Sequence, residues 1–211
     1  GEVRLTSGAL DLNKSLRLRG PGHAQLAIDA GNASRVFSVL ASTTNWISGV
    51  TIREGRTRDG DIGGFAADPP TSSAPGGGIH NAGTLVLNDC EIAFCGTGQG
   101  GWGELERGAN AGPGGGIYNR GSLFMTNCLM QGNYTGAGGD SFGAEGGNGG
   151  DGGAVSNDGT LVMERCSVSG NGSGPGGNTS GPGGRKGGRG GNGGGIDSVD
   201  RLTLNHCRIV N

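Results

Sequence analysis

The sequence predicts an all-β protein whose short parallel strands coil into a solenoid. Three observations predict this fold class. A pattern of Gly, apolar residues, Asn and Cys recurs at intervals of about 38 residues. Within each recurrence the apolar residues alternate, as they do on a half-buried strand. Leu, Ile, Val and Phe account for only 39 of 211 residues, too few for an ordinary globular core but enough for a solenoid, which needs few apolar residues per coil.

Composition and charge exclude several other classes. The chain has 52 Gly and 7 Pro, but Gly does not fall at every third position, which excludes collagen. The net charge is −2 and the basic residues are scattered, so we expect no nucleic-acid partner. There is no starting Met and no apolar stretch of signal-peptide or membrane-spanning length. Residues 1–211 therefore read as a single β-helix domain cut from a longer chain.

The N-terminal third fits the repeat loosely. Alternating Leu residues between positions 10 and 18 predict one coil, and residues 47–52 resemble residues 87–92 of the next. Together with four later units they give about six coils. In this alignment Leu16 and Val50 precede Cys90 in one ladder.

Four regular units follow, each of three short strands joined by turns rich in Asn and Gly. Successive Cys residues of these units are 38, 38 and 41 positions apart. Stacking places equivalent side chains about 4.8 Å apart, so each unit contributes one rung to every ladder. The expected ladders are Ile79, Ile117, Val155 and Ile196; Cys90, Cys128, Cys166 and Cys207; and Asn81, Asn119 and Asn157.

The Cys ladder has two interpretations, a metal or redox column and a set of small apolar core residues, of which we favour the second. A spacing of about 4.8 Å exceeds the usual Cβ separation of a disulfide, so free thiols are expected. Cys95 lies outside this ladder and is the candidate for a reactive thiol. For the Asn ladder we favour amide hydrogen bonds from coil to coil over ligand binding.

Long Gly-rich loops leave the coil at one edge. They hold 36 of the 52 Gly and are either flexible excursions or an ordered layer of extended, polyproline-II-like strands. We also expect them to cover an outward apolar stripe formed by Val86, Phe124, Val162 and Thr203. The three loops are residues 96–116, 132–153 and 170–195.

The repeat motifs resemble a known group. The segments GGGIHNAGTLVLNDCEI (76–92), GGGIYNRGSLFMTNCLM (114–130) and GGAVSNDGTLVMERCSV (152–168) are similar to the right-handed parallel β-helix repeats of bacterial surface and autotransporter passenger proteins, including the chlamydial polymorphic membrane proteins. A second hallmark of that group, FxxN, is incomplete, because residues 130–133 and 168–171 keep only the Asn. The resemblance implies a right-handed single-stranded β-helix and a secreted or cell-surface location.

Two classes of function follow. The first is a non-enzymatic stalk, adhesin passenger or self-assembling fibre subunit, without a cofactor, whose partners are further repeats or copies of itself stacked end to end, surface glycans or host receptors. The second is a carbohydrate-active enzyme or glycan-binding module on a pectin-lyase-like scaffold. For ligand contact the candidates are Trp102 and Tyr134, which lie in the loops.

Signals for catalysis and metal binding are weak in this sequence. No outward column gathers the carboxylates of a lyase or glycosidase, and the three His lie in different turns, so no catalytic residues are assigned. Residues 146–151 match the start of a calcium-binding nonapeptide once, which leaves Ca²⁺ as a minor alternative to the absence of any cofactor.

Overall fold

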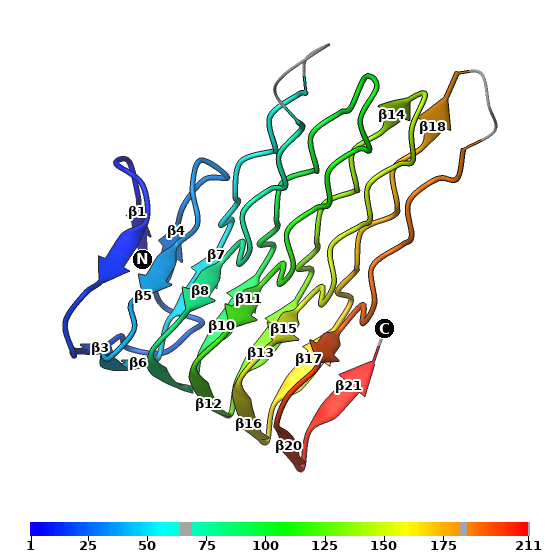
Figure 1. The fold of residues 1–211 in the computed structure, drawn as a ribbon. Helices are drawn as coiled ribbons and strands as arrows, with labels where there is room; N and C mark the ends of the chain where they lie inside the picture. The colour runs from blue at the N-terminus through cyan, green and yellow to red at the C-terminus, as the bar shows by residue number, and fades with distance from the viewer. Residues whose placement is uncertain (64–68, 182–184, 211) are drawn as a thin grey trace.

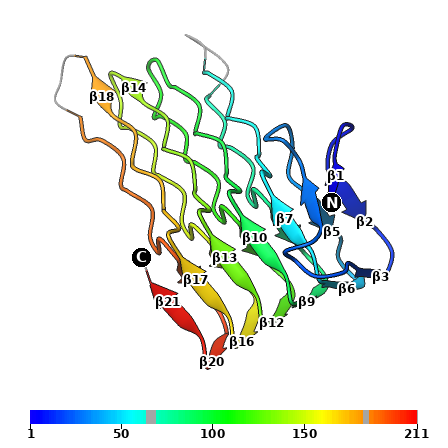
Figure 2. The same cartoon turned by 180° about the vertical axis from the view of Figure 1, so that it is seen from behind.

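The computed structural model describes residues 1–63, 69–181 and 185–210, and most of its strands form three parallel sheets stacked turn on turn (Figures 1 and 2). A fourth, two-stranded parallel sheet in the Gly-rich loops pairs β14 (Ser141–Phe142) with β18 (Thr179–Ser180). Sheet A contains β1 (Glu2–Arg4), β4 (Ala27–Asp29), β7 (Thr51–Arg53), β10 (Glu91–Ala93), β13 (Leu129–Gln131), β17 (Ser167–Ser169) and β21 (Arg208–Val210). Sheet B contains β2 (Leu10–Leu12), β5 (Phe37–Val39), β8 (Ile79–Asn81), β11 (Ile117–Asn119), β15 (Val155–Asn157) and β19 (Ile196–Ser198). Sheet C contains β3 (Arg17–Arg19), β6 (Thr44–Ser48), β9 (Thr84–Asn88), β12 (Ser122–Thr126), β16 (Thr160–Glu164) and β20 (Leu202–Asn205).

This arrangement confirms the all-β parallel solenoid. The described ranges contain no helix, and so none long and apolar enough to cross a bilayer. The expected count of about six coils included two N-terminal turns that fit the repeat loosely. Only four turns have the full Gly-rich repeat, and the turns before them are shorter and less regular. The right-handed sense of the coil stays a prediction.

The apolar ladders fill the interior in the expected register. Ile117 pairs with Ile79 on one side and Val155 on the other, and Ile196 follows Val155. Cys90, Cys128 and Cys166 are buried beside Ile92, Met130 and Val168. The predicted position of Leu16 is wrong. Leu26 precedes Val50 in the Cys ladder, because Ala27 pairs with Thr51, while Leu18 pairs with Ile47 in sheet C.

The Asn ladder links successive turns through its amides. Asn81 Nδ2 donates to Asn119 Oδ1 at 2.7 Å, and Asn119 Nδ2 donates to Asn157 Oδ1 at 2.6 Å. The last turn has Ser198 here, whose Oγ accepts from Asn157 Nδ2 at 2.9 Å. All three Asn side chains are fully buried, so each amide depends on the next turn for a partner.

The Gly-rich turn before each sheet B strand explains the repeated glycine pair. The first glycine has a left-handed backbone, with φ of 72° at Gly76, 73° at Gly114 and 66° at Gly152. The second is packed against neighbouring backbone, and a Cβ on Gly77 would lie 2.3 Å from the carbonyl oxygen of Gly96. Neither position accepts a side chain without strain.

The Gly-rich loops form an ordered layer in the described residues, not flexible excursions. Each loop runs outward and returns, and the outward and return segments, here called limbs, lie side by side in Figures 1 and 2. There are four such pairs, since a loop before β8 does the same and was missed by the sequence analysis. Outward limbs are 55–63, 96–104, 133–142 and 171–181; return limbs are 69–78, 107–116, 145–154 and 185–195.

Backbone hydrogen bonds join neighbouring limbs at every third residue. The amides of Thr97, Gly100 and Gly103 donate to the carbonyls of Tyr134, Ala137 and Asp140. Neighbouring return limbs are joined in the same way. The backbone amides of Gly108, Ala111 and Gly114 donate to the carbonyls of Glu145, Asn148 and Asp151. A three-residue period is that of the polyproline II helix, which makes no hydrogen bonds of its own and so needs neighbours to satisfy its backbone.

A column of hydroxyl groups ties the outward limbs to the return limbs. Thr97 Oγ1 donates to the Gly112 carbonyl at 2.7 Å and accepts from the Gly136 amide at 3.0 Å. Thr135 makes the equivalent pair of bonds one turn further on. The column comprises Thr57, Thr97, Thr135 and Ser173.

The expectation that the loops cover the apolar stripe of sheet C is wrong. The limbs leave between sheets A and B, and sheet C lies on the other side of the coil (Figure 1). Phe124 on β12 is 38% exposed and Trp46 on β6 is 37% exposed, so the stripe is open to solvent.

We expect Asn119→Ala to lower the free energy of unfolding by about 2–4 kcal/mol, because it removes the buried acceptor of Asn81 Nδ2 and the buried donor to Asn157 Oδ1. Urea unfolding measures this loss. Asn88→Ala, at an exposed position of β9, is the matched control and should change stability by less than about 0.5 kcal/mol. Equal effects of the two variants would contradict the role given to the ladder.

We expect Gly139→Ala to disrupt the limb layer, because a Cβ there would lie 1.9 Å from the Gly101 carbonyl oxygen. Hydrogen exchange should accelerate in limbs 96–104 and 133–142. Gly172→Ala is the control, since no atom lies within 4 Å of its Cβ position, and it should leave exchange unchanged. Fast hydrogen exchange throughout these limbs in the unmodified protein would contradict the ordered layer.

Candidate functional surfaces

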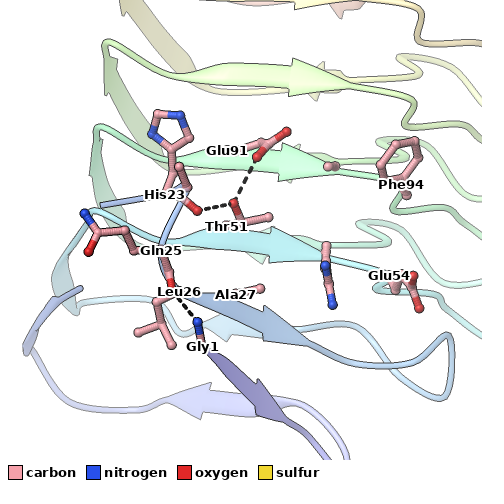
Figure 3. Close-up of a pocket in the computed structure, with 12 residues that line it drawn as sticks. Gly1, His23, Gln25, Leu26, Ala27, Thr51, Glu54, Glu91 and Phe94 are labelled. Carbon is pink, nitrogen blue, oxygen red and sulfur yellow. Dashed lines mark hydrogen bonds between the residues drawn. The ribbon is translucent and has the colours of Figure 1, made fainter. Parts of the chain in front are cut away.

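A groove lies on the outer face of sheet A in the N-terminal half of the chain. It holds about 420 Å³ and lies across β4, β7 and β10, with residues 23–26 along one side. In Figure 3, Thr51 and Glu91 point toward one another from neighbouring strands, and Phe94 stands beyond the end of β10. Strand alternation brings these side chains outward, because Ile52 and Ile92 between them face the core.

Glu91 in the groove is hydrogen-bonded to polar side chains of both neighbouring strands of sheet A. Glu91 Oε2 accepts from Thr51 Oγ1 at 2.9 Å, and its other oxygen accepts from Gln131 Nε2 at 2.5 Å. Beside the groove, His23 Nδ1 lies 3.1 Å from Asp89 Oδ1. Glu91 therefore already has two polar partners and is fixed between neighbouring turns.

Arg53, at the other side of the groove, is clamped by two acids. Its Nε donates to Asp29 Oδ2 at 2.7 Å and its Nη2 to Glu2 Oε2 at 2.6 Å. The hydrogen bond to Asp29 is the main reason that the pKa of Arg53 is raised, so the guanidinium stays charged. A charged Arg that donates to two carboxylates can orient an anionic or hydroxylated ligand but cannot serve as a base.

The two aromatic residues expected to contact a ligand do not form one site. Tyr134 is 40% exposed and its ring lies over Gly96, at the base of the neighbouring limb. Trp102 is 36% exposed but lies six residues further along that limb, which is about 19 Å at 3.1 Å per residue. A single small ligand could not touch both rings.

Phe94, which the sequence analysis did not propose as a contact residue, lines the groove. It is 56% exposed, has φ of 53°, and stands where the chain leaves β10 for its limb. A Cβ on Gly132 would lie 2.7 Å from its ring, so Phe94 covers the turn that precedes Tyr134. The Phe94 ring thus lines the groove at the point where the chain leaves β10 for the limb layer. A signal for this was present in the sequence, because Phe94 and Gly132 hold equivalent positions of successive units.

Three Cys residues of the Cys ladder, Cys90, Cys128 and Cys166, are buried in the core. All five are free thiols in the described chain, and Cys90, Cys128 and Cys166 each lie within hydrogen-bonding distance of the backbone carbonyl two residues earlier. Cys128 lies between two other thiols, and hydrogen bonds with Cys166 and Cys90, together with burial, raise its pKa. This column matches the interpretation as small core residues.

Cys95 is not the reactive thiol that its isolation in the sequence suggested. It is fully buried and belongs to a second polar ladder with Asn133 and Asn171, the two Asn of the incomplete FxxN motifs. Its amide donates to Asn133 Oδ1 at 3.0 Å, and its Sγ accepts from the Gly55 amide at 3.4 Å. Burial raises the pKa of its thiol from 9.0 to about 12.

The calcium-like segment forms part of a return limb. The amides of Gly147 and Gly149 donate to neighbouring limbs, and Asp151 Oδ1 accepts from the Asn192 amide at 2.6 Å. In the described ranges no three His, Cys, Asp or Glu side chains come close enough together to hold a metal ion. The segment is thus explained by the limb layer.

A second groove lies on sheet C, over the uncovered apolar stripe. It holds about 560 Å³ and is lined by Arg17, Trp46, Val86 and Asn88 among others. The guanidinium of Arg17 sits 4.7 Å from the centre of the Trp46 ring. Trp46, which the sequence analysis did not propose as a contact residue, thus presents one face of its ring to a cation of the same chain.

Comparison with known proteins adds no relative: no family model, curated protein or solved structure matches this chain.

We expect Cys95 to be unreactive in the folded protein and Cys207, which is partly exposed, to react first with a thiol reagent at pH 8. The unmodified protein and Cys95→Ala should then release the same amount of chromophore when native and differ by one thiol when unfolded. A native difference would show that Cys95 is accessible.

Alkaline pH should also weaken the fold through Cys95. The folded thiol, with a pKa of about 12, keeps its proton above pH 9, where the unfolded thiol with a pKa of 9.0 loses it. The free energy of unfolding therefore falls as pH rises from 9 toward 12. Tyr118, whose pKa is raised to about 12 by burial and Asp158, acts in the same direction. Cys95→Ala should show a smaller fall in denaturant midpoint over this range; an identical profile would contradict the assignment.

Proposed function

We propose that this chain is a non-catalytic structural and adhesive segment, a rigid spacer that displays a lateral contact surface on a secreted or cell-surface protein. The continuity of its ladders carries this proposal. Apolar, Asn and hydroxyl columns run from turn to turn, and the limbs continue the hydrogen bonding outside the coil. In the described residues every buried side-chain nitrogen and oxygen has a hydrogen-bond partner. Such a body resists bending because each turn is fixed to its neighbours over its whole width.

The chemistry of the main groove supports a binding role over a catalytic one. Glu91 accepts one hydrogen bond on each oxygen, from Thr51 and Gln131, and is thereby fixed in one orientation that suits a ligand contact. Arg53 is similarly held by Asp29 and Glu2. The extracellular location rests on the resemblance of the repeats to bacterial surface β-helices.

Glycan binding in the same groove is a second candidate, favoured by one observation. Phe94, whose ring is exposed, lines the groove together with the hydroxyl of Thr51 and the carboxylate of Glu91. Sugars are recognised by this combination of an aromatic platform and fixed polar groups. The groove then supplies the adhesive contact of the spacer, so the two proposals are compatible.

The structural and adhesive proposal is tested by incubating the protein with acidic and neutral polysaccharides and measuring unsaturated products and new reducing ends. We expect no bond cleavage. Release of products that stops in a Glu91→Gln variant would contradict the non-catalytic assignment and favour the carbohydrate-active alternative.

Glycan binding is tested on an array with Phe94→Ala and a matched control, Phe124→Ala, which removes an exposed ring from the outer face of sheet C. We expect retention of any bound glycan to fall by about tenfold in Phe94→Ala, equivalent to roughly 1.4 kcal/mol, and to stay unchanged in the control. Equal losses of glycan retention in both variants would contradict a specific contact with Phe94.

A further inference from the structure

The limb layer begins with a step on the side of the coil. Residues 30–36 connect β4 to β5 by a short turn, whereas the first outward limb, 55–63, and the first return limb, 69–78, extend well beyond it (Figures 1 and 2). A concave site of about 340 Å³ lies between this short turn and the base of the two limbs. The site is built from residues inside the chain and shares none with the groove of sheet A.

The first limb carries a side chain where the later limbs require glycine. Gly98, Gly136 and Gly174 hold one column, and a Cβ on any of them would lie 1.8–2.2 Å from a carbonyl oxygen of the limb before it. In the first limb this position is Arg58, the residue whose carbonyl oxygen lies closest to the Cβ position of Gly98. A side chain at this position is directed away from the later limbs, so Arg58 fills space that a further limb would need and lines the concave site.

Positive charge dominates the lining of the site. Arg35 comes from the short turn before β5, and Arg56 and Arg58 come from the base of the first outward limb. Asp11 on β2 is the one carboxylate among the lining residues. Three guanidiniums that face one carboxylate in a concave site produce a local positive potential, although the net charge of the whole chain is −2.

Arg35 is held in place but has few partners for its charge. Its Nη2 donates to the Pro75 carbonyl at 2.9 Å, which is its one side-chain hydrogen bond within the described residues. Burial lowers the pKa of Arg35, and the more distant charge of Asp11 raises it. Guanidinium has five N–H donors and keeps its proton, so Arg35 has donors left for an anion that enters the site.

Arg56 is fixed at the base of the limb by a chain of hydrogen bonds. Its Nη2 donates to Asp59 Oδ1 at 3.0 Å, and the same oxygen accepts from the Gln99 amide of the next limb at 2.9 Å. Arg58 forms no ion pair with the described residues. The site therefore combines two guanidiniums without a bound carboxylate, Arg35 and Arg58, with one that the limb layer positions.

The size and the remaining lining indicate the class of ligand. A volume of about 340 Å³ is in the range of small-molecule sites and is larger than a single inorganic anion needs. Apolar surface comes from Ala9, Ala33 and Ala74, and Ser38 faces outward because Phe37 and Val39 beside it are buried. The planar guanidinium matches the oxygens of a carboxylate or sulfate group. A sugar that carries such a group offers charged oxygens, hydroxyls and an apolar ring face together.

We propose that this site, here called the arginine step and lined by Arg35, Arg56 and Arg58, binds the acidic sugar units of a polysaccharide. The carboxylate or sulfate of the sugar accepts hydrogen bonds from Arg35 and Arg58, and the ring lies against the alanines of the short turn and the return limb. The inference rests on the proposed adhesive role and gives the charge of its ligand.

The test measures retention of the protein on immobilised polygalacturonate at low ionic strength. We expect Arg58→Gln to lower the affinity by about tenfold, because it removes one charge-assisted hydrogen bond from the site. Arg35→Gln should do the same. The control is Arg201→Gln, which removes the same charge from an exposed position on the turn before β20 and should leave retention unchanged. Neutral dextran should not retain the protein, and sodium sulfate should compete at a lower ionic strength than sodium chloride.

Equal losses in Arg58→Gln and Arg201→Gln would overturn the proposal, because net charge alone would then hold the polymer. Competition by sulfate without any retention on polygalacturonate would assign the site to a free anion and would also overturn it. Hydrogen exchange of the ladders in each variant shows whether the fold is intact, and Arg58, which is exposed, can be replaced without disturbing the core. Failure of the structural role is seen separately, as fast exchange of the ladders in the unmodified protein.

Discussion

The spacing of about 4.8 Å between parallel strands is the constraint on which the rest of this structure depends. It applies to three sheets and to two layers of limbs, so each residue meets its equivalents in the turns before and after it. Asn119 is stabilised because it contacts Asn81 and Asn157, and Thr97 because its hydroxyl lies between two limbs. The residue type at a position is therefore selected by its column more than by its neighbours in the sequence.

The constraint explains what the sequence analysis could and could not predict. In the regular units each column repeats one residue type, so the Ile, Cys and Asn ladders followed from counting. Leu16 was misplaced because the first turns lack the Gly-rich turn that marks the start of a unit. Cys95 was misread because its column holds Asn133 and Asn171, and one Cys among Asn does not repeat a type.

The limb layer was harder to predict because its main bonds are between backbone groups. Amides and carbonyls leave no trace in residue identity, and the glycines that allow the close approach are also common in flexible segments. The one side-chain signal was the hydroxyl column, with Thr97, Thr135 and Ser173 each 38 residues apart. The groove at sheet A could not be predicted for a related reason. Strand alternation turns Thr51 and Glu91 outward, but it does the same on every sheet and so does not mark one face as a groove.

The three-residue period of the limbs limits how this protein can change in length. An insertion of one or two residues within a limb would shift every hydrogen bond beyond it to the wrong face, whereas three residues would restore the phase. The tips are free of this restriction. In each loop one hydrogen-bonded pair of residues joins the two limbs, and the separation along the chain is 10, 8, 8 and 11 positions in turn: Asp61 with Thr71, Gly101 with Ala109, Gly139 with Gly147, and Gly177 with Gly188. Sequence can therefore be added at the tips of the loops without disturbing the hydrogen bonds between limbs.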